Sequence, residues 1–239
     1  MTDSAHNLYA VIPAAGVGRR MGSEIPKQYL ALKNKRVIEH TTERLLAITA
    51  IKKIVVVVAT HDEVWPSLAV ANDARVMSAE GGEERFHSVL NGVRAIPAKS
   101  EDSWVLVHDA ARPCIRPQDI TAMVEQLKDH PVGGILGAPV RDTLKKSDAD
   151  NQITDTVDRT SLWHAFTPQM FRLGTLRNAL EKVVESQGIV TDEAQAIERC
   201  GLTPALVEGH HDNLKITHPD DLILAGLYLD SQQASGVFG

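Results

Sequence analysis

Residues 8–21 read LYAVIPAAGVGRRM, a short apolar run that leads directly into a loop of very small residues. The run LYAVI is typical of a buried strand. The smallest residues of the loop are Ala14, Ala15, Gly16 and Gly18. Because they carry almost no side chain, a ligand can approach the backbone there and meet its N–H groups. The stretch therefore predicts a strand that opens onto an anion-binding loop.

Basic side chains follow these small residues closely. Arg20 lies within the loop, and Lys27 lies in the segment PKQY a few residues later. Backbone donors combined with mobile cations suit a nucleoside triphosphate, which carries several negative charges. Two better-known glycine loops fail on spacing, because Met21 replaces the third glycine of a dinucleotide loop and no Gly-Lys-Ser/Thr ending follows Gly16. An ordinary glycine-rich turn remains the alternative.

The composition limits the class of partner. The net charge of -6 argues against a broad nucleic-acid or anionic-membrane surface, so the basic residues are expected to form a local pocket for a small ligand. No apolar stretch approaches the length of a membrane span, and residues 1–7 lack a signal-peptide core. We therefore expect a cytoplasmic protein with no nucleic-acid and no membrane partner.

Cysteine and histidine give no metal signal. Cys114 and Cys200 lie far apart in no C-x-x-C pair, and we interpret them as small buried apolar residues. His210 and His211 would point to opposite faces of a strand, and no further ligand lies at metal spacing. A solvated loop is favoured for this pair.

Apolar strand-like runs alternate with helical patterns along the chain. Strands are expected at residues 8–12, 54–59, 76–78, 104–108, 134–140 and 204–207. Helices are expected at residues 37–48, 85–96 and 117–128. Nearly continuous apolar strands separated by helices predict an α/β fold, with a mostly parallel sheet covered by helices on both faces.

Residues 141–160 break this rhythm, because they are polar and place a turn-like centre between threonine-containing flanks. We interpret them as a protruding β-hairpin arm, the alternative being a solvated surface excursion. The rest of residues 1–239 is expected to form a single domain, with residues 231–239 as a frayed tail.

The carboxyl ends of the strands are where ligands of such sheets bind. Three strands are followed by residues 14–21, 81–85 and 109–113, which should therefore meet at one rim. Asp109 could coordinate Mg²⁺ there, or instead cap the following segment or pair with Arg112. The glycines at the start of residues 81–85 could let the backbone read a base edge or could form a simple turn. Lys215, in a short extended run, suggests a surface residue when taken alone.

Eight motifs occur together in a fixed order. They are A-A-G-x-G-x-R-M, P-K-Q-Y, G-G-x-x-R-x-x-S, V-H-D-A-A-R-P, V-D-R, W-H-A-x-T-P-Q, T-D-E-A and N-x-K-I-T. This combination resembles the 2-C-methyl-D-erythritol 4-phosphate cytidylyltransferase family nearly end to end. The resemblance implies a Rossmann-like nucleotidyltransferase that uses Mg²⁺ or another divalent cation. It further implies transfer of CMP from CTP to a sugar-alcohol phosphate, with release of pyrophosphate, in non-mevalonate isoprenoid precursor biosynthesis.

The resemblance also implies roles for individual residues. The nucleotide would contact Ala14, Ala15, Gly16, Gly18, Gly82, Glu83, Ser88 and Ala110. Charge in the transition state would be stabilised by Arg20 and Lys27, and Asp109 would hold the metal and help bind the substrate. The acceptor would be positioned for attack by Arg159 and Lys215. Its pocket would also include Arg112, Thr143 and Thr167.

Family enzymes are homodimers with crossed arms, so Thr143 and Arg159 would serve the neighbouring subunit. The nearest alternative is a ribitol-5-phosphate cytidylyltransferase, which shares the nucleotide half of the pattern. The V-D-R and W-H-A-x-T-P-Q segments favour methylerythritol phosphate over ribitol phosphate. A non-catalytic nucleotide-binding protein or a nicotinamide oxidoreductase would leave Lys27, Asp109 and Lys215 unexplained together.

Overall fold

A seven-stranded sheet forms the centre of the computed structural model, which describes residues 7–16, 25–97 and 101–238. The strands are β1 (Leu8–Pro13), β4 (Ile51–Val58), β5 (Val76–Glu80), β6 (Trp104–Val107), β7 (Gly133–Pro139), β10 (Trp163–Arg172) and β11 (Ala205–Glu208). Their order across the sheet is β11-β7-β10-β6-β1-β4-β5. β10 runs antiparallel to both its neighbours, and the other pairs are parallel. The mostly parallel sheet is thus confirmed.

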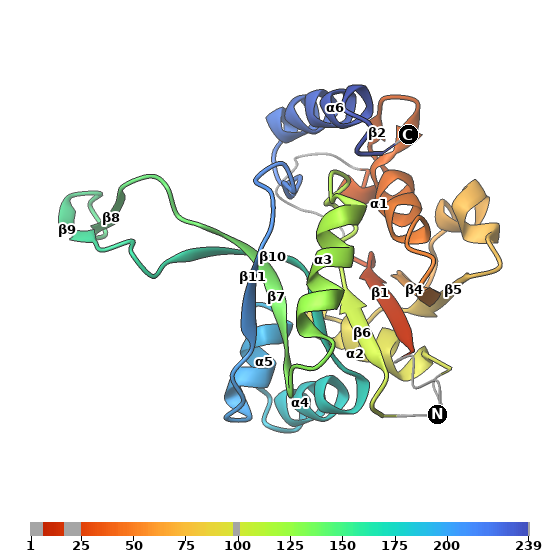
Figure 1. Ribbon diagram of the computed structural model, residues 1–239, viewed down its shortest axis with the longest axis horizontal. Coiled ribbons are helices and arrows are strands. Elements are labelled where there is room, and N and C mark those ends of the chain that lie inside the picture. The colour runs from red at the N-terminus through yellow and green to blue at the C-terminus, as the bar shows by residue number, and fades with distance from the viewer. Residues whose placement is uncertain (1–6, 17–24, 98–100, 239) are drawn as a thin grey trace.

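Helices cover both faces of this sheet (Figure 1). They are α1 (Val37–Leu46), α2 (Arg85–Ala95), α3 (Pro117–Leu127), α4 (Leu173–Glu185), α5 (Glu193–Arg199) and α6 (Pro219–Ala234). Single 3-10 turns occur at η2 (Lys27–Tyr29), η3 (Trp65–Ser67) and η4 (Ala69–Asn72), and β2 (Ala31–Leu32) pairs with β3 (Lys35–Arg36). The sequence patterns found α1, α2 and α3 but not the last three helices.

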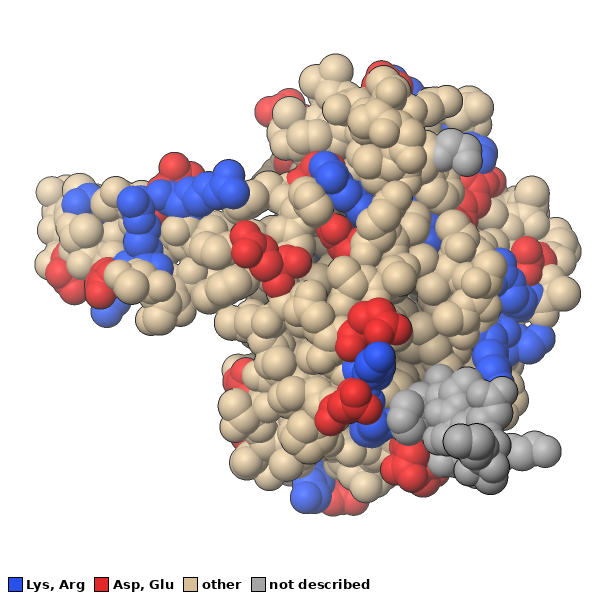
Figure 2. Space-filling model, viewed as in Figure 1, with Lys and Arg blue, Asp and Glu red and all other residues tan. Residues whose placement is uncertain are grey.

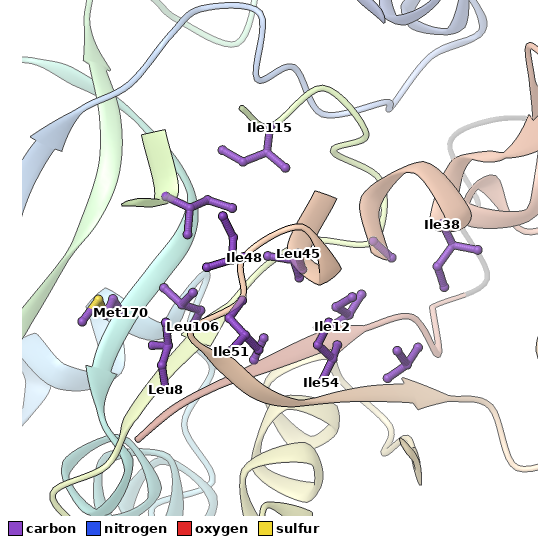
Figure 3. Close-up of a cluster of buried hydrophobic side chains, with 14 of the residues drawn as sticks. Leu8, Ile12, Ile38, Leu45, Ile48, Ile51, Ile54, Leu106, Ile115 and Met170 are labelled. Atoms are coloured by element: carbon purple, nitrogen blue, oxygen red, sulfur yellow. The ribbon is translucent and has the colours of Figure 1, made fainter. Parts of the chain in front are cut away.

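The core is divided by the alternation of side chains along β1. Leu8 and Ile12 lie in a cluster with residues of α1 and α3, part of which Figure 3 shows. Tyr9 and Val11 lie in a second cluster with residues of α2, α4 and α5. Since successive strand residues point to opposite faces, an apolar run with no polar positions requires helices on both sides.

β1 is also where the strand order reverses, because β4 and β5 lie on one side of it and β6 lies on the other. In open α/β sheets a crevice forms at such a point, beyond the carboxyl ends of the strands. The fold therefore places the loop after β1 next to the loop after β6.

The arm expected at residues 141–160 is a hairpin. β8 (Leu144–Ser147) pairs antiparallel with β9 (Ile153–Val157), and both project far from the body (Figure 1). Most residues of the hairpin are exposed, and both basic and acidic side chains lie along it (Figure 2).

The C-terminal segment corrects one expectation, since α6 extends to Ala234 and the predicted frayed tail from residue 231 is wrong there. Gln232 is 2% exposed and donates from Nε2 to the Cys114 carbonyl, at 2.9 Å. The Arg44 guanidinium lies 4.5 Å from the centre of the Phe238 ring. A polar stretch without an apolar period gives no local sign of such anchoring.

Several smaller predictions can be compared with the fold. Cys114 is buried and Cys200 is partly buried, while His210 and His211 are exposed in a loop. The run around Lys215 is not a strand. Within the described ranges, no helix has the length and apolar character needed to span a membrane.

Candidate active site

A cavity of about 580 Å³ opens at the carboxyl ends of β1, β5 and β6. It is lined by Pro13, Ala14, Ala15, Gly16, Lys27, Gln28, Gly82, Glu83, Glu84, Arg85, Ser88, Asp109, Ala110, Ala111, Lys215 and Thr217. The three segments predicted to meet at one rim therefore do so. The volume is that of a site for a small organic ligand.

The loop after β1 is held in place by the PKQY segment. Gln28, which is buried, donates from Nε2 to the Ala14 carbonyl at 2.6 Å and to the Gly16 carbonyl at 3.1 Å. Lys27 lines the cavity, and its Nζ donates to the Ile216 carbonyl at 3.0 Å. Gln28 thus shapes the loop while Lys27 supplies a positive charge to the same space. Gly18 and Arg20 lie outside the described residues.

The paired glycines after β5 permit a close approach between two rim segments. A Cβ atom on Gly81 would lie 2.2 Å from the Cβ of Ala15, and one on Gly82 would lie 2.5 Å from the Cβ of His87. Neither separation is sterically possible without movement. The Gly82 N–H donates to the Ser88 Oγ at 3.1 Å, so Ser88 both lines the cavity and fixes this turn.

Asp109, at the end of β6, has three cationic neighbours. Its Oδ1 lies 3.0 Å from a terminal nitrogen of Arg85, and its Oδ2 lies 2.9 Å from the Lys215 Nζ and 3.3 Å from the Arg112 Nε. Burial alone would raise the pKa of Asp109, but Arg85, Lys215 and Arg112 outweigh it and hold the pKa well below its usual value. Asp109 is therefore a negative charge on the cavity wall that these neighbouring cations keep ionised.

The backbone of Asp109 is held from behind by two buried side chains. Its N–H donates to the Thr167 Oγ1 at 3.1 Å, and this hydroxyl lies 2.9 Å from the His108 Nδ1. The His108 Nε2 lies 3.2 Å from the Arg112 carbonyl. Burial lowers the pKa of His108 to about 4, so the ring is neutral at pH 7. Only the tautomer with its proton on Nε2 satisfies all three contacts, with Thr167 donating to Nδ1.

Several predicted site residues do not line the cavity in the described part of one chain. Arg112 and Thr167 are buried behind Asp109, and Arg112 donates to the Asn213 carbonyl at 2.7 Å. Thr143 and Arg159 are exposed on the arm, where Arg159 donates to the Arg141 carbonyl. Lys215, in contrast, lines the cavity, although its local sequence alone suggests a surface residue.

Sequence reasoning also missed residues that the fold brings to the site. Gln28 and Arg85 line the cavity, and Glu193 lies completely buried behind it. The Arg85 terminal nitrogen contacts the Glu193 Oε1 at 2.6 Å. Arg85 begins α2 directly after a rim loop, which is a usable signal. Glu193 lies in the T-D-E-A motif, but its local sequence does not show its partner, which is 108 residues away along the chain.

Comparison with known proteins agrees with this geometry. The profile of the family described as 2-C-methyl-D-erythritol 4-phosphate cytidylyltransferase matches residues 8–231. The chain belongs to this cytidylyltransferase family. The cytidylyltransferase of Aeromonas hydrophila is 50% identical over 234 residues, which cover 98% of this chain and 94% of that protein. The cytidylyltransferase of Vibrio cholerae is 50% identical over 224 residues, which cover 94% and 97%.

Solved cytidylyltransferase structures share the fold as well. The crystal structure of the Francisella tularensis cytidylyltransferase superposes with a TM-score of 0.81 at 37% identity, covering 93% of this chain and 99% of that one. The chain therefore shares both the sequence motifs and the Rossmann-like fold of the family.

Proposed function

We propose that the cavity at the ends of β1, β5 and β6 is where this cytidylyltransferase joins CTP to 2-C-methyl-D-erythritol 4-phosphate. The product would be 4-diphosphocytidyl-2-C-methyl-D-erythritol, released with pyrophosphate, in isoprenoid precursor biosynthesis. One observation carries this placement: Lys27, Lys215 and the buried Asp109 converge on a single cavity beside a loop of open backbone. The reaction is inferred from family membership, and the location of the active site is inferred from these converging side chains.

The nucleotide would lie across the two rim loops. The small residues of positions 14–16 leave room for phosphate oxygens to approach the backbone, and Gly82, Glu83, Ser88 and Ala110 line the same space. The Gln28 side chain holds this loop before ligand arrives. A preformed loop lowers the ordering cost of binding a flexible triphosphate.

The chemistry needs charge stabilisation rather than a general base. An acceptor phosphate monoester is already anionic, so one of its oxygens can attack the α-phosphorus of CTP directly. A bond forms between that oxygen and the α-phosphorus, and the bond to the bridging oxygen of the leaving pyrophosphate breaks. Lys27 would stabilise the negative charge that develops, together with Arg20, and Lys215 would orient the acceptor.

A divalent cation fits the donors present. Mg²⁺ in nucleotide sites takes one or two carboxylates and fills its remaining positions with phosphate oxygens and water. Asp109 is an ionised carboxylate on the cavity wall, and it would hold the metal. When bound, the cation neutralises phosphate charge. The described residues contain no group of three or more His, Cys, Asp or Glu side chains that could bind a metal without a substrate.

The arm would complete the acceptor site of a second copy in a homodimer with crossed arms. Thr143 and Arg159 are exposed at the base of the arm. The arm also exposes Ile153, which is 68% exposed although apolar. An exposed hairpin that carries both acceptor-binding and apolar side chains is suited to contact another protein chain.

Pyrophosphate release from CTP tests the function, with methylerythritol phosphate and ribitol 5-phosphate supplied separately. We expect release that requires both CTP and methylerythritol phosphate, with little release for ribitol phosphate. Equal or faster release with ribitol phosphate would reassign the acceptor. Binding of CTP without release under either condition would indicate a non-catalytic nucleotide-binding protein.

A further inference from the structure

Glu193 is a charged side chain with no exposed surface, at the first position of α5 behind the cavity. Its carboxylate accepts two hydrogen bonds from the Arg85 guanidinium, at 2.6 and 3.2 Å. Burying a carboxylate costs several kcal/mol unless a well-oriented cation compensates it. Burial raises the pKa of Glu193, and the Arg85 cation opposes that shift. A buried ion pair of this kind therefore needs a reason beyond stability.

Arg85 is shared between two carboxylates. While two of its nitrogens bind Glu193, its Nε donates to the Asp109 Oδ1 at 3.1 Å. The guanidinium group is planar and rigid, so fixing one edge of it determines where its remaining N–H groups point. Glu193 therefore sets the direction from which Arg85 approaches Asp109.

We infer that Glu193 is a positioning residue for the transfer reaction, acting through Arg85 to fix the Asp109 carboxylate. With Oδ1 bound by Arg85, Oδ2 is the oxygen that faces Lys215. This inference rests on the proposed function, because it gives Asp109 a role in the reaction. It adds a buried residue on α5 that is not among the residues lining the cavity.

The first turn of α5 is itself tied to the central sheet. Asp192 caps the helix by accepting from the Gln195 N–H at 2.9 Å. Gln169 of β10 donates to Asp192 at 3.0 Å and accepts from the Ala194 N–H at 2.8 Å. Glu193 lies between these anchored positions, so its backbone is held to the strand next to β6.

Glu193 has a second role, which is to balance the positive charges around Asp109. Three cations, Arg85, Arg112 and Lys215, surround the two carboxylates of Asp109 and Glu193. If Lys215 turns to an acceptor phosphate, two cations and two carboxylates remain, and the buried cluster stays neutral. Without Glu193, Arg85 would carry an unbalanced charge and would compete with Lys215 for Asp109 or for substrate phosphate.

Glu193→Gln tests the inference, because it keeps the shape of the side chain and removes its charge. We expect kcat to fall about 10- to 100-fold, as for other partners that orient a catalytic carboxylate or metal ligand. The calorimetric Kd for CTP should change less than about threefold, because the lost interaction acts in the transition state. A merely structural defect in the pocket would weaken CTP binding as well.

Glu181→Gln is the matched control. Glu181 lies on α4 and pairs with Arg94 at 2.8 Å. Arg94 is on α2, the helix that also carries Arg85, but this pair lies at the surface. Its loss should leave both kcat and the CTP Kd unchanged. If Glu193→Gln fails to fold, Glu193→Asp replaces it in the same measurements. This change keeps the carboxylate but shortens the side chain, so that it no longer reaches Arg85 in the same way.

A double-mutant cycle shows whether Glu193 acts through Arg85. Arg85→Gln combined with Glu193→Gln should be no slower than Arg85→Gln alone. Independent, additive losses would overturn the inference, as would a folded Glu193→Gln chain with normal kcat. Absence of pyrophosphate release by the unaltered chain would instead refute the proposed function.

Discussion

The cavity and the arm handle charge in opposite ways. Asp109 on the cavity wall and Glu193 behind it are both buried. Arg85 binds both carboxylates, and Lys215 also binds Asp109. On the arm, Arg159 is exposed and donates to the backbone of its own arm. Buried, mutually fixed charges can stabilise a transition state without reorganising, whereas exposed ones remain available to another molecule. Under the proposed function, the buried charges would serve the transfer step, and the exposed arm would contribute to the acceptor site of a second copy.

Removing the charge of Lys27 should have the largest effect. Lys27→Ala should lower kcat about 10²- to 10³-fold, as does loss of one preorganised group that stabilises transition-state charge. Lys27 lines the cavity and lies outside the two large apolar clusters of the core, so the chain should remain folded. Pyrophosphate release measures kcat, and circular dichroism shows whether the chain is folded.

Lys52→Ala is the control for Lys27. Lys52 is an exposed lysine near the start of β4, at the opposite end of the sheet from the cavity. It should leave turnover unchanged. Near-normal pyrophosphate release by a folded Lys27→Ala chain would remove Lys27 from the proposed mechanism.

The buried His108 should make the floor of the cavity sensitive to acid. Its pKa is lowered to about 4 by burial, so the unfolded chain binds a proton more readily. Its contribution to stability is complete above pH 6.5 and is lost as the pH falls toward 4. Between pH 7 and pH 5 this amounts to about 2 kcal/mol of unfolding free energy.

His108→Gln isolates that contribution, because glutamine does not titrate. The unaltered chain should lose about 2 kcal/mol more than the variant over this pH range, measured by urea unfolding. Asp109, whose pKa is lowered, titrates below its ordinary range and would add its own loss only in stronger acid. Equal pH slopes for the two chains would show that His108 is not held neutral.

A change on the arm should act on assembly and leave the cavity alone. Ile153→Ser should weaken dimerisation about tenfold or more, since burial of an isoleucine is worth about 1.5–3 kcal/mol. The CTP affinity should not change. Sedimentation and calorimetry measure these outcomes. Ile189→Ser provides the control, because Ile189 is 74% exposed on the body. Weaker CTP binding in the Ile153 variant would contradict the claim that the arm acts independently of the cavity.

The same contrast explains what the sequence could predict. β1, the rim loops and Asp109 follow from local patterns, because a buried parallel strand is an apolar run and its ligands come from the residues directly after it. The hairpin arm is also local, since a turn between polar, threonine-containing flanks signals it.

Residues whose roles depend on long-range contacts could not be placed in this way. Glu193 meets Arg85 across 108 positions, and Thr167 meets His108 across 59. The strand β10 was missed because it carries a register shift between Ala165 and Gln169, which breaks the regular alternation. Motifs named these residues through family resemblance, but their contacts required the fold.

Mixing two inactive chains tests the division between cavity and arm most directly. Lys27→Ala damages the cavity, and Arg159→Ala damages the arm that would serve a partner. A heterodimer would contain one cavity with Lys27 that receives an arm with Arg159. A random equal mixture should therefore regain about a quarter of the unaltered turnover, since half of the sites in half of the dimers are intact. No recovery in demonstrated heterodimers would contradict the crossed-arm account.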